Sequence, residues 1–163
     1  MQKIKVHLFM SVIVNIIYSL FIFLKLKSSI AVNFQFNGLP NPNSYQSSLN
    51  YAAMQIVLCI VIAILFLMLP WLVKTLPIKY VNIPNRNKWL RGEERDKSLK
   101  KLNFMLLLLG TVLIYFLTAM SMVVYIANIS TPLVLPILPF FSILLIFLGF
   151  LITWIVKLYK LFP

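Results

Sequence analysis

Residues 102–127 read LNFMLLLLGTVLIYFLTAMSMVVYIA and contain no Asp, Glu, Lys or Arg. The hydrocarbon core of a bilayer is about 30 Å thick, and about 20 helical residues are enough to cross it. Because lipid offers no hydrogen-bonding groups, a backbone that crosses it must satisfy its own polar groups, as an α-helix does. This stretch therefore predicts a transmembrane helix.

Three further stretches have the same character: residues 6–24, 52–73 and 133–156. Continuously apolar runs of this length differ from the alternating strands of a membrane β-barrel. Over the whole chain 61% of residues are hydrophobic and 11% are charged, whereas soluble proteins average about 25% charged residues. The sequence predicts an all-α integral membrane protein with four transmembrane helices, in one domain over residues 1–163. Because Pro132, Pro136 and Pro139 crowd the start of the fourth span, we expect a bent helix or a late start there.

The distribution of charge predicts how these helices are oriented. The chain has 15 Lys and Arg, three acids and a formal charge of +12. On a soluble protein this charge would indicate nucleic-acid binding, but here the basic residues lie between apolar spans, so no nucleic-acid partner is predicted. Two basic residues precede the first span, nine lie in residues 74–101 and two follow the last span, which places 13 of the 15 on one side. By the positive-inside rule that side is the cytoplasm, and both termini are cytoplasmic.

The first span also resembles a secretory signal. Lys3 and Lys5 precede its apolar run, and residues 29–31 have the small-x-small pattern of a cleavage site. However, the run is longer than the 7 to 15 residues typical of a signal peptide, and Lys25 and Lys27 interrupt the approach to that site. We expect an uncleaved transmembrane helix.

Residue types that perform catalysis or bind metals are scarce. Glu93, Glu94 and Asp96 are the only acids. We interpret them as a charge-compensated helix start, because basic residues nearby can pair with them at helical spacing. His7 is the single histidine, far in sequence from any acid, and Cys59 lies in an apolar run where it should be a buried hydrophobe. The sequence therefore predicts no catalytic, metal or cofactor site, and no enzyme.

The spans contain polar side chains that suit hydrogen bonds between helices. These residues are Asn15, Gln55, Thr111, Thr118, Ser121, Ser142 and Thr153. The alternative is that some of them line a path for a solute. A path should arrange them around a water-filled cavity, whereas a binding protein can have a dry core.

The loop over residues 74–101 carries nine basic and three acidic residues, interleaved with apolar ones. Such a loop can lie on an anionic inner leaflet or provide a surface for a partner protein. The candidate contact residues are Lys79, Arg86, Lys88, Trp89, Arg91 and Arg95. Membrane lipids with anionic headgroups are the first partners predicted, and another membrane protein is the second.

The loop between the first two spans alternates apolar and polar residues over positions 32–37 and then has turn-forming residues over 37–43. This pattern predicts a short extended segment followed by a turn, on the outer side of the membrane. A ligand-binding loop is the alternative. The candidate contact residues are Asn33, Phe34, Phe36, Gly38 and Pro40.

Several short runs resemble a bacterial family of small multi-pass membrane proteins of unknown function. They are residues 31–34 (AVNF), 38–40 (GLP), 81–85 (VNIPN), 89–90 (WL), 94–95 (ER) and 126–128 (IAN). The chain is similar in this region to the amino-terminal domain of immunity proteins that protect producers of a sporulation-delaying toxin. The family often has histidine at the position of Asn33 and tryptophan at that of Tyr45.

The resemblance implies a bacterial inner-membrane protein. Together with the shortage of catalytic residues, it leads us to predict a non-enzymatic protein that binds another membrane component, as an immunity or accessory factor does. The runner-up is a small transporter or permease-like subunit for a neutral or lipidic solute.

Overall fold

The computed structural model describes residues 2–26, 29–35, 41–77, 80 and 94–161 of the chain. The four predicted helices are present in it: α1 (Gln2–Lys25), α2 (Ser48–Thr75), α4 (Glu94–Ile129) and α5 (Ile137–Leu161). Each is long and apolar enough to cross a membrane. Strands β1 (Ser29–Gln35) and β2 (Asn41–Ser47) form an antiparallel pair between α1 and α2.

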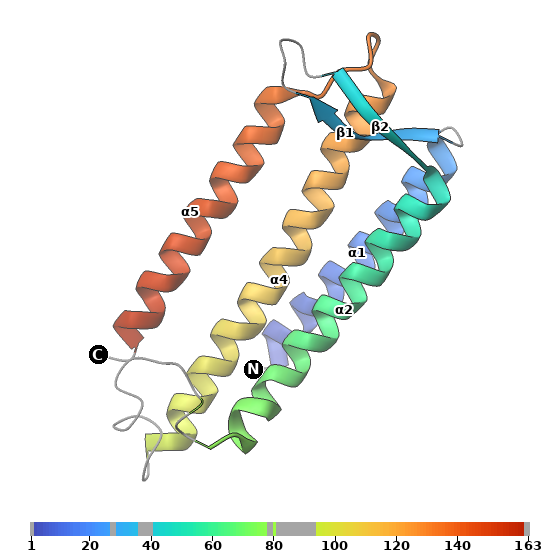
Figure 1. Cartoon of the computed structure of the whole chain (residues 1–163). Helices are drawn as coiled ribbons and strands as arrows, with labels where there is room; N and C mark the ends of the chain where they lie inside the picture. Colours follow the sequence, from blue (N-terminus) through green and yellow to red (C-terminus); the bar gives the residue numbers. More distant parts are fainter. Residues whose placement is uncertain (1, 27–28, 36–40, 78–79, 81–93, 162–163) are drawn as a thin grey trace.

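The helices form a group of three with a fourth at one side. Helices α1, α2 and α4 all pack against one another, whereas α5 packs against α4. Figure 1 shows that α1 begins and α5 ends at the same end of the bundle, and that the β1–β2 pair covers the opposite end. An even number of spans requires this arrangement, with the two chain ends together.

One face of α1 supplies much of the core. Its buried residues recur every three or four positions, which keeps them on one helical face toward α2 and α4. They are Ile4, Leu8, Ser11, Asn15, Ser19 and Ile22. Half of these residues are polar, and one of them, Asn15, forms a hydrogen bond to another helix, to Thr118 of α4.

Helices α2 and α4 approach closely at Gly110. A Cβ atom placed there would lie 2.5 Å from Cγ and 2.8 Å from Cβ of Phe66. Small residues at helix crossings in membranes allow this kind of backbone approach. Gly110 therefore sets the spacing between α2 and α4.

All four helices begin at positions other than the edges of their apolar runs, and local contacts explain the starts of α2 and α5. Helix α2 begins at Ser48 because the Ser47 hydroxyl accepts a hydrogen bond from the Asn50 amide at 3.2 Å and caps the helix. Helix α5 begins at Ile137, which confirms the late start expected from the prolines. The Pro136 carbonyl accepts the first helical bond, from the Phe140 amide at 3.1 Å.

The loop after α1 confirms the extended segment but corrects the predicted turn. Residues 41–43, predicted as part of the turn, instead begin β2, where Pro42 pairs with Phe34. Proline is tolerated in this strand because a two-stranded sheet consists only of edge strands. The candidate residues Phe36, Gly38 and Pro40 lie outside the described residues.

Candidate functional site

Polar side chains from α1, α2 and α4 meet inside the bundle, and we call this group the polar seam: Asn15, Tyr51, Gln55, Thr118 and Ser121. The Asn15 Nδ2 donates to the Thr118 Oγ1 at 2.9 Å, which joins α1 to α4. The Tyr51 hydroxyl donates to the Ser121 Oγ at 3.3 Å, which joins α2 to α4. The two α4 hydroxyls lie one turn apart and each also donates to a carbonyl of its own helix. The seam is therefore a set of direct bonds between helices.

The polar seam is shielded from solvent. Asn15 is 1% exposed and Ser121 is 2% exposed. Two buried amide oxygens, Oδ1 of Asn15 and Oε1 of Gln55, accept no hydrogen bond in the described structure. Burying such an oxygen has a cost of about 1 to 3 kcal/mol. The polar seam therefore includes amide oxygens whose burial is unfavourable. Its hydrogen bonds fix how α1, α2 and α4 are rotated relative to one another.

The other predicted polar residues do not join helices. Thr111 is buried, but its hydroxyl donates to the Leu107 carbonyl of its own helix at 2.8 Å. Thr153 likewise donates to the Gly149 carbonyl, and Ser142 is exposed on α5. Hydrogen bonding between helices is therefore confirmed for Asn15, Thr118 and Ser121 and is wrong for Thr111 and Thr153.

At the opposite end from the chain termini, Asn128 connects α4 to β1. The Ala31 amide donates to Asn128 Oδ1 at 2.8 Å, and Asn128 Nδ2 donates to the Ala31 carbonyl at 2.9 Å. The same Nδ2 donates to the Val124 carbonyl at 2.8 Å. The side-chain amide thus bonds to Ala31 as the backbone of a neighbouring strand would. We call these contacts the Asn128 latch.

Apolar contacts support the latch on both sides. Ala31 is fully buried and Ile30 is 1% exposed, and Ile30 packs in a cluster with Ile22 and Tyr51. Phe34 packs against the outer end of α4 and the segment that leads to α5. The hairpin is therefore docked on the helices at two points rather than extending freely from them.

The docked hairpin presents an outer surface with a shallow cavity beside it. Exposed residues alternate with partly buried ones along both strands, with Asn33 and Tyr45 on the exposed side. Asn33 Nδ2 donates to the Ser44 Oγ at 2.7 Å across the pair. A cavity of about 210 Å³ lies between β1, α4 and the start of α5, and Asn33 and Phe34 both line it. Of the five candidate contact residues in this loop, Asn33 and Phe34 therefore lie together at the cavity.

Of the six candidates in the basic loop, the structure describes one. Arg95 Nη2 donates to the Lys74 carbonyl at 3.1 Å and so joins the start of α4 to the end of α2. A cation is favoured there because carbonyl groups at a helix end carry partial negative charge. The remaining five lie outside the described residues: Lys79, Arg86, Lys88, Trp89 and Arg91.

The single cysteine and the single histidine have different surroundings. Cys59 is fully buried and packs with Ala63 and Leu107 among others, which confirms the expected small buried hydrophobe. His7 is exposed on α1. Within the part of the chain that the structure describes, no three His, Cys, Asp or Glu side chains gather in a way that could hold a metal ion.

Sequence reasoning missed Tyr51 and Asn128, which form three of the bonds that connect separate elements. Tyr51 precedes the second apolar run and Asn128 follows the third, so neither lies in the stretches searched for buried polarity. A search of the residues that flank each span would have found both.

No family model matches the chain, and comparisons with curated proteins and with solved structures gave no match. The resemblance to immunity proteins therefore stays a prediction. Two of the runs on which it depends, residues 31–34 and 126–128, contact each other through the Asn128 latch.

Proposed function

We propose that this chain is a non-enzymatic protein of the bacterial inner membrane, with both termini cytoplasmic, that binds another membrane component as an immunity or accessory factor does. The observation that favours binding over transport is the polar seam. Two direct hydrogen bonds join α1 and α2 to α4 there, and Asn15, Tyr51 and Ser121 are almost fully buried, whereas Gln55 and Thr118 are partly buried. A solute path along them would instead require hydrated polar groups facing an opening.

The hairpin surface is the part of the molecule that we assign to the partner. Its position is fixed by two hydrogen bonds between Asn128 and Ala31 and by two apolar clusters. A surface that is already ordered loses little conformational entropy on binding. With the chain termini in the cytoplasm, the hairpin faces outward, where a factor that intercepts an external toxin would meet it.

Affinity purification from native membranes in mild detergent tests this proposal. The wild-type chain should retain a partner in stoichiometric amount, and Tyr45→Ala should lose it, because Tyr45 is 59% exposed on the hairpin. Lys5→Ala, at the other end of the bundle, is the matched control and should retain the partner. A partner retained equally by both variants would rule out the hairpin surface. A purified chain that moves a neutral solute across vesicles would support the transporter instead.

A further inference from the structure

A cavity of about 650 Å³ lies between the first turns of α4 and the last turns of α5. Among the residues that the structure describes, four lysines and three apolar residues line it: Lys100, Lys101, Phe104, Met105, Lys157, Lys160 and Leu161. No carboxylate is among these lining residues. The four lysines come from two helices that are far apart in sequence, so only the packing of α5 on α4 brings them to one place.

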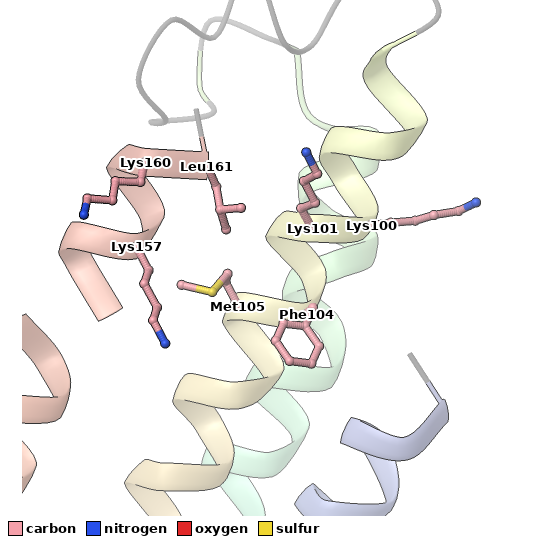
Figure 2. A pocket seen from close by; sticks show the side chains of 7 residues that line it. All are labelled: Lys100, Lys101, Phe104, Met105, Lys157, Lys160 and Leu161. Atoms are coloured by element: carbon pink, nitrogen blue, oxygen red, sulfur yellow. The ribbon is translucent and has the colours of Figure 1, made fainter. Parts of the chain in front are cut away.

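The lysines occupy two kinds of position around this cavity. In Figure 2, Lys101 and Lys157 lie on the sides of α4 and α5 that border the gap, whereas Lys100 and Lys160 extend away from it in opposite directions. Met105 and Leu161 reach into the space between the helices. The ammonium groups of Lys101 and Lys157 point toward opposite ends of this gap. Because lysine side chains are long and flexible, both ammonium groups can turn toward an anion between the helices, which would also contact apolar side chains.

A hydrogen bond close to this cavity holds the two helices together. Trp154 Nε1 donates to the Met105 carbonyl at 2.9 Å, a bond that ties α5 to α4 just inside the membrane from the lysines. Nearby, Leu158 and Leu161 pack in a cluster with Leu99 and Leu102 of α4. The spacing of the two helix ends is thus set by contacts outside the lysines, and the lysines can be replaced without removing those contacts.

A second cavity, of about 280 Å³ and lined almost wholly by apolar and aromatic side chains, lies farther along the same two helices. Residues 112, 115, 116 and 119 continue the helical stripe of 101, 104 and 105, and residues 143, 146, 147 and 150 continue that of 157 and 161. Phe116 and Phe147 stack there with centroids 4.2 Å apart. A molecule bound at the lysines would therefore find apolar surface in the direction of the membrane centre.

These features match the two ends of an anionic phospholipid. Lysine binds phosphate as a point charge, and basic cavities between helices at the membrane surface bind acidic lipid headgroups. The apolar wall and the continuing groove suit acyl chains, which a free phosphate ion lacks. We propose that the cavity bounded by Lys101 and Lys157 binds the phosphate of an anionic phospholipid, with the acyl chains along the α4–α5 groove. This proposal does not depend on the partner at the hairpin.

Native mass spectrometry of the full chain in detergent measures the binding directly. Phosphatidylglycerol should bind as a discrete adduct, and phosphatidylcholine of the same acyl length should bind much more weakly. Each lysine near an anionic headgroup contributes about 1 kcal/mol, so Lys101→Gln with Lys157→Gln should weaken phosphatidylglycerol binding about 30-fold.

Two control variants separate the cavity from general charge and from folding. Lys3→Gln with Lys5→Gln removes the same charge at the same end of the bundle and should leave binding within about twofold of wild type. Lys101→Arg with Lys157→Arg keeps the charge and should retain binding. The proposed site would be overturned if the Lys3 and Lys5 variant lost as much phosphatidylglycerol binding as the glutamine variant at Lys101 and Lys157. It would also be overturned if that glutamine variant lost no binding.

The source of the phosphate is tested by competition. Inorganic phosphate and glycerol 3-phosphate at millimolar concentration should fail to displace phosphatidylglycerol, because they cannot occupy the apolar groove. Full displacement by either ion would show that the cavity takes a soluble phosphate and would overturn the lipid proposal. Equal binding of the neutral and the anionic lipid would overturn it as well.

Discussion

At the scale of single residues, two asparagines perform different tasks in this protein. Asn15 bonds to Thr118 inside the bundle and leaves its own oxygen without a partner. Asn128 uses both ends of its amide, accepting from the Ala31 amide and donating to the Ala31 and Val124 carbonyls. Of these two asparagines, only Asn128 bonds to the backbone at the edge of a strand. Only Asn128 therefore helps to hold the hairpin on α4.

Asn128→Ala should release β1 from α4. The substitution removes the two hydrogen bonds to Ala31, each contributing about 0.5 to 1.5 kcal/mol, so local opening of β1 should become easier by about 1 to 3 kcal/mol. Hydrogen exchange of the peptide that contains Ala31 should accelerate, while exchange in α2 stays slow. Asn33→Ala is the matched control, since it removes one exposed bond to Ser44. Unchanged exchange at Ala31 in the Asn128 variant would contradict the latch.

At the scale of elements, α5 differs from the other three helices. It packs mainly on α4, and none of its residues is buried. Helices α2 and α4, by contrast, are in close contact at Gly110 and Phe66. Replacement of glycine by alanine should therefore affect stability differently at Gly110 in α4 and at Gly149 in α5.

Gly110→Ala should destabilise the bundle, because the new methyl group would lie 2.5 Å from the Phe66 side chain. The nearest Phe66 atoms include Cβ and Cγ, which are close to the backbone and therefore have little freedom to move. Overpacking of this kind costs about 1 to 3 kcal/mol. Gly149→Ala, where nothing lies within 4 Å of the added atom, should be neutral or slightly stabilising. Thermal unfolding in detergent, followed by circular dichroism, compares the two variants. Equal melting temperatures would refute the close α2–α4 approach.

At the scale of the whole molecule, the bundle has two unlike ends. One carries the docked hairpin, and the other carries the beginning of α1, the end of α5 and the lysine-lined cavity. The positive-inside rule assigns the lysine-rich end to the cytoplasm. Cys59 is fully buried, so cysteines introduced at either end can be labelled against a low background.

Tyr45→Cys should react with an impermeant maleimide in intact cells, because it lies on the exposed side of the hairpin. Lys160→Cys should react only after the cells are permeabilised. A Cys59→Ala background removes the native thiol and serves as the control for labelling elsewhere. The reverse pattern would invert the orientation and would place the proposed partner surface in the cytoplasm.

The sequence by itself determined the four spans and the unequal distribution of charge, because a run of apolar residues long enough for a bilayer forces a helix regardless of its neighbours. The tertiary structure alone decided which polar residues pair. Spans that are apolar on every side contain little information about which face turns inward. Asn15 with Thr118 and Ala31 with Asn128 are about a hundred positions apart, so they meet only after α4 has packed. The second strand was missed for a related reason, because its Asn-Pro-Asn start favours a turn until a partner strand lies beside it.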